Sequence, residues 1–181
     1  MVETLEVLDS SAAEEINKCL SGSKVCGSEL RKAHYNLGFR IGKQIMKNRN
    51  LIDNKIAVII MMRAGLPFGL GISDALESKN DVSVLFSNVN NVYASFETVI
   101  IADAVINTGK TILDMKQNLE NKHLIVATNV ISDKYLDNLK GLDIFATRIS
   151  QHSYKGSKTA IISNGKGPDT GDRLFDNSFY K

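Results

Sequence analysis

The stretch Glu97–Thr111, ETVIIADAVINTGKT, contains a buried strand, a turn and the start of a helix. Its apolar, β-branched run ends on Asp103, and Asn107–Thr111 then leads into a predicted helix, TILDMKQNLE. Backbone N–H groups at such a turn, with the helix dipole behind them, form a site for an anion. Thr108 and Thr111 add hydroxyl donors. This stretch therefore predicts a strand–turn–helix corner that holds a phosphate.

The segments on either side repeat the alternation of strand and helix. Two helices are expected first, AAEEINKCL capped by Ser10 or Ser11, and a longer one from Ser28 with His34 on its apolar stripe. The predicted strands are IAVIIMM, VSVLF, HLIVATNVI, LDIFATRI and TAIIS, and the helices between them are LGISDALES and DKYLDNL. Such alternation predicts right-handed crossovers and a mostly parallel sheet. Ligands of such sheets bind beyond the carboxyl ends of the strands.

Composition is that of an ordinary globular protein. The chain has 181 residues, 22 Lys+Arg against 20 Asp+Glu and a net charge of +2, so one domain with a real core is expected. Basic and acidic residues are interspersed, which argues against nucleic acid as a partner. The longest apolar run is too short to span a bilayer, and the N-terminus does not read as a signal peptide. Cys19 and Cys26 suit free thiols in a reducing compartment, so we expect a cytoplasmic protein with no membrane partner.

The turn after Asp103 has two phosphate-binding readings besides a plain capped corner. Gly109-Lys110-Thr111 satisfies the end of the P-loop pattern GxxxxGK[ST], but the first glycine would have to stand at Ala104. The same stretch resembles the phosphoribosyl pyrophosphate (PRPP) motif of type I phosphoribosyltransferases, an apolar strand, one or two acids, a short apolar stretch and then Thr-Gly-Gly-Thr or similar. Ala104 stands where many members have a second acid, and Lys110 where a second glycine is usual. The resemblance implies that Asp103 reaches the ribose hydroxyls while the loop holds the 5′-phosphate.

Two further loops narrow the resemblance to the uracil phosphoribosyltransferases. MMRAGLPFGL is similar to that branch's pyrophosphate loop, in which Arg63 would meet the pyrophosphate as a guanidinium fork. Near the C-terminus, GPDTGDRLF resembles the uracil-binding segment, since Gly171–Phe175 match directly and Asp169 falls on the functional aspartate. Ile162 and Gly167 then match the base-binding positions to within about a residue.

The resemblance covers residues 55–177 and implies a reaction. The protein is expected to transfer the phosphoribosyl group from PRPP to uracil, giving UMP and pyrophosphate in pyrimidine salvage, with Mg²⁺ arriving bound to PRPP. The implied catalytic residues are Arg63, Asp103 and Asp169. The implied PRPP-binding residues are Arg63, Ala64, Gly65, Asp103, Ala104, Val105, Ile106, Asn107, Thr108, Gly109, Lys110, Thr111 and Asp169. The implied uracil-binding residues are Ile162, Gly167, Asp169 and Thr170.

The resemblance also implies an architecture. We expect an α/β, single-domain type I phosphoribosyltransferase fold over residues 1–181, with a mostly parallel sheet flanked by helices and a small hood from the N- and C-terminal segments. Within it, residues 1–54 form a helical N-terminal region, 55–150 the PRPP-binding core and 151–181 the base-binding hood. The family further implies a homodimer or higher homo-oligomer.

One departure keeps other functions open. Phe86-Ser87-Asn88 stands where the family carries a second pyrophosphate-binding arginine, and the β-arm that follows is short. Lys110 is a candidate to supply that charge. A non-catalytic regulator that binds PRPP or a nucleotide, and a phosphoribosyltransferase for another base such as a purine or orotate, are the two alternatives to uracil transfer.

Overall fold

Six parallel strands form one sheet in the computed structural model, which describes residues 2–5, 9–86, 95–119, 122–151 and 168–175. The strand order is β1-β6-β5-β4-β2-β3, and every neighbouring pair is parallel. The strands are β1 (Val2–Thr4), β2 (Lys55–Ile60), β3 (Asp81–Phe86), β4 (Thr98–Ile106), β5 (His123–Ser132) and β6 (Asp143–Ser150). The predicted parallel α/β sheet is therefore confirmed.

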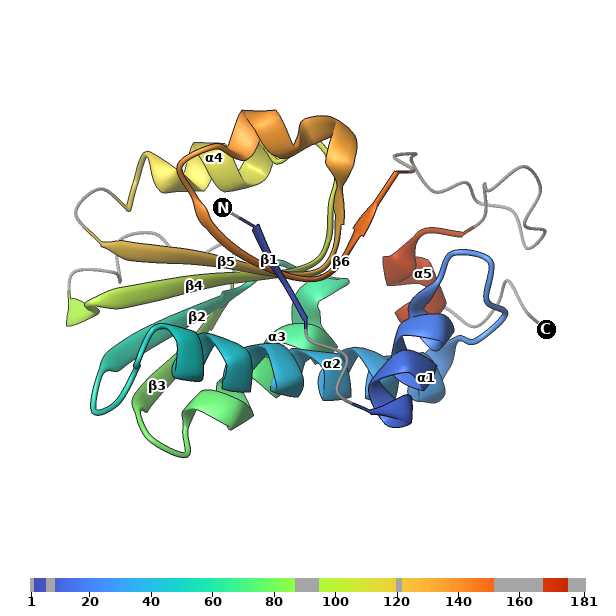
Figure 1. Ribbon diagram of the computed structural model, residues 1–181, viewed down its shortest axis with the longest axis horizontal. Coiled ribbons are helices and arrows are strands. Elements are labelled where there is room, and N and C mark those ends of the chain that lie inside the picture. The colour runs from blue at the N-terminus through green and yellow to red at the C-terminus, as the bar shows by residue number, and fades with distance from the viewer. Residues whose placement is uncertain (1, 6–8, 87–94, 120–121, 152–167, 176–181) are drawn as a thin grey trace.

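Helices cover both faces of the sheet (Figure 1). The helical elements are α1 (Ser10–Cys19), α2 (Gly27–Asn48), α3 (Gly65–Leu76), α4 (Lys110–Lys116), the 3-10 helix η2 (Asp133–Leu139) and α5 (Thr170–Phe175). In Figure 1, α2 and α3 lie below the sheet, α4 lies above it, and α1 and α5 lie together beyond its right-hand end. Among the described residues, no helix is both long enough and apolar enough to cross a membrane.

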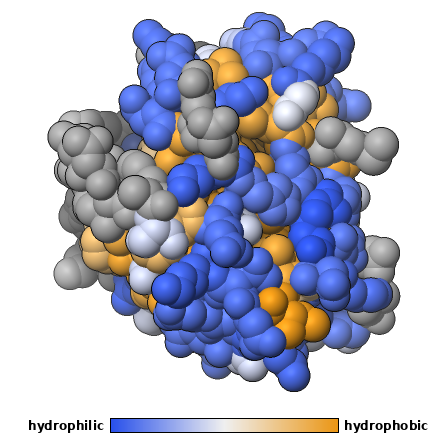
Figure 2. All heavy atoms as spheres, turned by 90° about the vertical axis from the view of Figure 1, so that its left-hand side faces the viewer, coloured by the Kyte–Doolittle hydropathy of each residue, from blue (hydrophilic) through white to orange (hydrophobic). Residues whose placement is uncertain are grey.

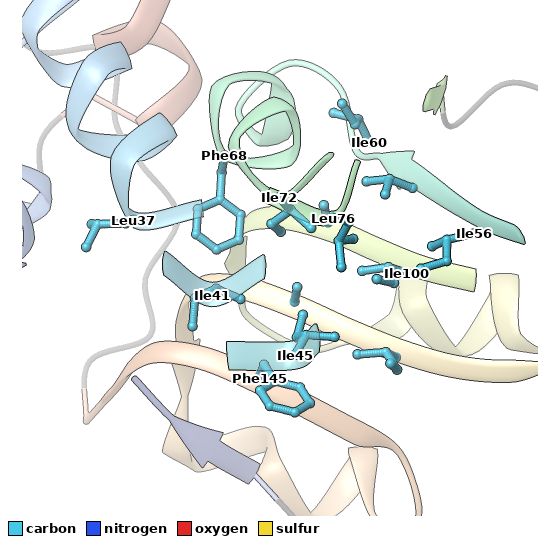
Figure 3. Close-up of a cluster of buried hydrophobic side chains, with 14 of the residues drawn as sticks. Leu37, Ile41, Ile45, Ile56, Ile60, Phe68, Ile72, Leu76, Ile100 and Phe145 are labelled. Atoms are coloured by element: carbon cyan, nitrogen blue, oxygen red, sulfur yellow. The ribbon is translucent and has the colours of Figure 1, made fainter. Parts of the chain in front are cut away.

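The larger core lies between the sheet and the pair α2 and α3 (Figure 3). Alternate residues of β2 and β4 face this side and are fully buried, because a strand presents every second side chain to the same face. The helices α2 and α3 pack apolar side chains at helical spacing against these strand residues. The labelled side chains of Figure 3 include Leu37, Ile41, Ile45, Phe68, Ile72 and Leu76. The intervening strand residues form a second core with α4 and η2, which includes Ile59, Ile101, Ile112, Val126 and Leu139. Burial on both faces explains the unbroken apolar runs of these strands.

Glycines let α2 and α3 approach closely. A Cβ at Gly71 of α3 would lie 2.8 Å from the backbone nitrogen of Phe39 and would overlap the carbonyl oxygen of Tyr35. On α2, a Cβ at Gly42 would lie 2.9 Å from the carbonyl oxygen of Ile72. The two helices therefore touch backbone to backbone, which fixes the position of α3 and of the loop that precedes it.

Several element boundaries differ from the sequence-based expectation. Asp9, and not Ser10 or Ser11, caps α1, because its Oδ1 accepts from the backbone nitrogen of Ala12 at 2.8 Å. The helix α3 begins at Gly65, earlier than the predicted LGISDALES segment. The strand β4 continues past Asp103 to Ile106, because Ala104, Val105 and Ile106 extend its apolar run and pair with β5.

Two elements were not expected. The strand β1 pairs with β6, with Val2 opposite Ile144. GDRLF, expected as part of a Gly-rich loop, lies in the helix α5. The predicted strand TAIIS falls outside the described residues.

The end of the sheet opposite α1 and α5 is mainly hydrophilic (Figure 2). Its hydrophobic spheres lie in separate patches on this view. The structural features that resemble a ligand site gather instead at the other end, where the carboxyl ends of the strands lie.

Candidate functional site

A cavity of about 580 Å³ lies at the carboxyl ends of the strands. Its wall is contributed by the segments that follow β2, the second half of β4 with the turn into α4, the ends of β5 and β6, the end of α1 and the start of α5. This is the edge at which a parallel sheet binds its ligands. All three loops that were singled out in the sequence contribute to it.

Arg63 enters the cavity from the segment between β2 and α3. The Met62–Arg63 peptide bond is cis, and the Arg63 side chain is 56% exposed. Its Nη2 donates to Oδ1 of Asp172 in α5 at 2.8 Å. Ala64 also lines the cavity, whereas Gly65 is buried against β4, where a Cβ would lie 2.8 Å from the carbonyl oxygen of Ala102. A residue without a side chain is therefore required at the start of α3.

Asp103 is the carboxylate on the cavity wall of β4. Burial raises the pKa of Asp103 to about 6, and backbone N–H groups of Val105 and Ala104 only partly offset this effect. The carboxyl group therefore titrates close to neutrality and is mostly ionised at pH 7. Ala104 is fully buried on the other side of the strand, so a second acid at that position would face the core.

The segment after β4 turns directly into the helix α4, as the sequence predicted. Gly109 adopts a φ of 72° and precedes the first helical residue, Lys110. Asn107 and Thr111 line the cavity, and Thr108 Oγ1 accepts from the backbone nitrogen of Lys110 at 3.4 Å. Thr108 and Lys110 are exposed. These two residues and Gly109 belong to the described turn but do not contribute to the cavity wall.

Asp169 and Thr170 form the C-terminal part of the wall. Oδ1 of Asp169 accepts from the backbone nitrogen of Asp172 at 2.7 Å, so this aspartate sits at the start of α5 as a cap. Ile162 and Gly167, the remaining predicted base-binding residues, lie outside the described residues. Among the described predicted residues, the structure thus gathers Arg63, Ala64, Asp103, Val105, Ile106, Asn107, Thr111, Asp169 and Thr170 around one cavity.

Sequence reasoning missed the β5–β6 side of the cavity. Ser132, Arg148 and Ser150 line it, from the carboxyl ends of two strands that were read only as core. Arg148 is a charged residue near the carboxyl end of the predicted strand LDIFATRI, and this charge was the available signal. Arg173 is 3% exposed and donates to the carbonyl oxygens of Lys18, Leu20 and Val25. It thereby attaches α5 to the turn between α1 and α2.

A buried polar layer lies behind this wall. Asn129 of β5 approaches Nδ1 of His34 on α2 at 3.5 Å, and both residues are at most 2% exposed. Burial, followed by the charges of Arg173 and Arg148, lowers the pKa of His34 to about 3, while burial raises the pKa of Cys19 to about 12. The histidine is therefore neutral and the cysteine protonated at pH 7. His34 is structural, as its place on the apolar stripe of α2 predicted.

A model of the family "Uracil phosphoribosyltransferase" matches residues 40–177 of this sequence. The chain belongs to the uracil phosphoribosyltransferase family. It is 28% identical over 178 residues to the uracil phosphoribosyltransferase of Methanococcus vannielii, an alignment that covers 84% of this chain and 75% of the relative. The recognition made from the three loops is therefore confirmed.

A solved structure shows the same fold. The hypoxanthine-guanine phosphoribosyltransferase of Schistosoma mansoni superposes with a TM-score of 0.50 at 17% identity, covering 70% of this chain and 69% of that one. The corresponding protein of Bacillus anthracis gives a TM-score of 0.47 at 17% identity, over 66% and 80% of the two chains. The fold is that of the type I phosphoribosyltransferases.

Proposed function

We propose that this protein transfers the phosphoribosyl group of PRPP to uracil, giving UMP and pyrophosphate. The observation that carries the proposal is one cavity at the strand ends, in a chain of this family, which is lined by Arg63, Asp103, Asn107, Thr111 and Asp169 from three separate loops. One substrate with a pyrophosphate, a ribose and a 5′-phosphate needs groups of these three kinds at one site. The reaction would serve pyrimidine salvage.

Each loop has a role in the proposed reaction. Arg63 neutralises the departing pyrophosphate, since guanidinium donors match phosphate oxygens. The ionised carboxylate of Asp103 accepts hydrogen bonds from the ribose hydroxyls. Asn107–Thr111 hold the 5′-phosphate with backbone N–H groups and hydroxyls, with Lys110 near its rim. Asp169 fixes the base side of the site together with Thr170, Ile162 and Gly167.

Mg²⁺ would enter the site bound to the oxygens of PRPP and to water, and no residue of the protein is assigned as its direct ligand. The carboxylates of Asp103 and Asp169 on the cavity wall suit a site that accepts this cation together with its substrate. When bound, Mg²⁺ neutralises charge on the pyrophosphate as it leaves.

The proposal extends to the architecture and the setting of the protein. Residues 1–54 form an N-terminal region that is mainly helical and also contributes β1, 55–150 form the PRPP-binding core and 151–181 the base-binding hood. The protein acts in the cytoplasm, in keeping with its free thiols, and assembles as a homodimer or higher homo-oligomer as the family does.

The experiment is a turnover assay with a panel of acceptor bases. The protein is incubated with PRPP, Mg²⁺ and uracil, orotate, hypoxanthine or guanine, and pyrophosphate release is followed. Uracil is expected to be the base that is used, and Asp103→Asn and Arg63→Met are expected to lower kcat/KM by about 10²-fold. Asp74→Asn, an exposed change on α3 away from the cavity, is the matched control and retains activity.

Other outcomes point to the alternatives. Turnover with a different base alone would assign the protein to another branch of phosphoribosyltransferases. Absence of turnover with every base, together with saturable PRPP binding by calorimetry, would replace the enzyme by a PRPP-binding regulator.

A further inference from the structure

None of the residues proposed above to bind PRPP lies on β5 or β6, although both strands line the cavity. Arg148 of β6 lies opposite Val130 of β5, and Val130 lies opposite Val105 of β4. All three residues line the cavity. Arg148 therefore lies at the same height in the sheet as Val105 of β4, and β5 lies between their two strands.

This position separates Arg148 from the pyrophosphate side. Two strand spacings place β6 about 10 Å from β4, and β2, which leads to Arg63, is one spacing farther on the other side. Arg63 and Arg148 thus enter the cavity from opposite sides. If PRPP occupies the ends of β2 and β4, the part of the cavity beside Arg148 is left for the acceptor base.

The surroundings of Arg148 suit a ligand rich in oxygen acceptors. Ser132 and Ser150 line the same side, and the Ser132 hydroxyl is buried with no hydrogen-bond partner among the described residues. Arg173, 3% exposed, also lines the cavity, and its Nε has no described partner. Donors and positive charge therefore gather on the part of the cavity wall that Ser132, Arg148, Ser150 and Arg173 contribute.

The chemistry of uracil transfer produces negative charge at this place. The N1–C1′ bond forms while the C1′–O bond breaks and its electron pair leaves with pyrophosphate. The proton on N1 is lost to solvent water. As N1 loses this proton, negative charge spreads over the ring onto O2 and O4. A fixed guanidinium beside these oxygens stabilises that charge and lowers the free-energy cost of removing the N1 proton.

We propose that Arg148 contacts the acceptor base and stabilises the negative charge that develops on it as N1 loses its proton. The inference rests on the proposed function and adds a catalytic residue to it. It also narrows the acceptor, since the site would favour bases that carry an acidic ring N–H conjugated with carbonyl oxygens.

The test compares uracil with 5-fluorouracil, whose ring N–H groups are more acidic, in wild type, Arg148→Met and Arg148→Lys. Arg148→Met is expected to lose about 10²-fold in kcat/KM with uracil and clearly less with 5-fluorouracil, which needs less help to carry the charge. Arg148→Lys, which keeps a cation, recovers part of the loss. PRPP affinity by calorimetry stays at the wild-type value. Arg40→Met on α2, where the arginine pairs with Asp9, is the control and changes neither rate.

The results that would overturn the inference are distinct from those that overturn the function. Equal losses with both bases, an unchanged rate in Arg148→Met, or a loss of PRPP affinity would each remove Arg148 from this role while uracil transfer stands. Wild-type protein that makes no UMP would end both proposals. Should Arg148→Met fail to fold, the wild type still decides through a series of 5-halogenated uracils. If the protein stabilises the charge on the base, kcat/KM is expected to change little as the N1–H group becomes more acidic. A steep rise of kcat/KM with N1–H acidity contradicts the proposal.

Discussion

Arg63 and Asp172 stand 109 residues apart in the chain, yet Nη2 of Arg63 donates to Oδ1 of Asp172 at 2.8 Å. The contact joins the loop after β2 to the helix α5. Asp172 is mostly covered, with 14% of its side chain exposed, whereas Arg63 is open to solvent. The residue that we propose for pyrophosphate binding is therefore already held by the segment that closes the other side of the cavity.

Replacing Asp172 with asparagine tests what this ion pair does. An exposed pair of this kind contributes at most about 1 kcal/mol to stability, so the midpoint of urea unfolding is expected to change little. Because the carboxylate competes with an anion for Arg63, its removal should tighten binding of inorganic pyrophosphate by about two- to fivefold. Calorimetry measures the affinity. Weaker pyrophosphate binding would show instead that Asp172 orients Arg63 for its ligand.

Asp103→Asn should make the protein more stable and less active. Burial raises the pKa of Asp103 from 3.8 to about 6, so the native state binds this proton more tightly than the unfolded state. The stabilisation by the neutral form is complete below the unfolded pKa and is lost as the pH rises through the folded pKa. At pH 7 the ionised group costs about 1–3 kcal/mol, which the asparagine avoids.

Urea unfolding at several pH values checks this sign. The gap in stability between Asp103→Asn and wild type is expected to open as the pH rises from about 4 to about 7, while turnover falls. A gap that is independent of pH would mean that the carboxylate is not desolvated. Retained turnover in the variant would remove Asp103 from the ribose site.

Gly109→Ala should damage the proposed 5′-phosphate loop. Gly109 has a φ of 72°, and an added Cβ would lie 2.5 Å from Cδ2 of Leu139. We expect a stability loss of about 1–2 kcal/mol and UMP affinity weakened about tenfold. Gly141→Ala is the matched control, since its φ of 84° imposes similar backbone strain in open space outside the loop. It should lose stability and retain UMP affinity. Equal affinities in the two variants would argue against this loop as the phosphate site.

Gly71→Ala should destabilise the whole fold. The added methyl group would overlap the carbonyl oxygen of Tyr35 and press on the backbone of Phe39, so α2 and α3 would have to separate. Overpacking between backbones costs about 3 kcal/mol or more. Gly22→Ala, where nothing lies within 4 Å, should leave the melting temperature near the wild-type value. A melting temperature for Gly71→Ala equal to that of Gly22→Ala would refute the tight contact.

The interior of the sheet could be predicted because its strands carry their signal locally. Runs such as IAVIIMM and HLIVATNVI are buried on both faces, so their apolar character is continuous and their alternation with helices implies parallel order. The short elements carried no such signal. Val2–Thr4 is too brief for a period to show, and it becomes a strand only because β6 offers it a free edge. The six residues of α5 form a helix because Asp169 caps its start and Arg173 holds it against the turn between α1 and α2.

The residues of the candidate site likewise fall into those that the sequence could predict and those that it could not. Arg63, Asp103 and Asp169 stand in contiguous motifs, so the sequence alone could single them out. Arg148 belongs to no motif, and its place in the cavity depends on a register that runs across β5 to β4. Such a relation between strands is a property of the folded sheet, which a single sequence read along its length does not display.

The pairing of β1 with β6 has a consequence for the order in which the chain can fold during synthesis. Val2 is synthesised long before its partner Ile144, because the two residues are far apart in the sequence. Until then β1 has nothing to pair with, and contacts between such distant segments form slowly. Once β6 has been made, its outer edge stays uncovered until β1 pairs with it, and an uncovered edge strand can pair with other chains. Of the six described strands, the first to be synthesised is thus the one that can pair only after the last has been made.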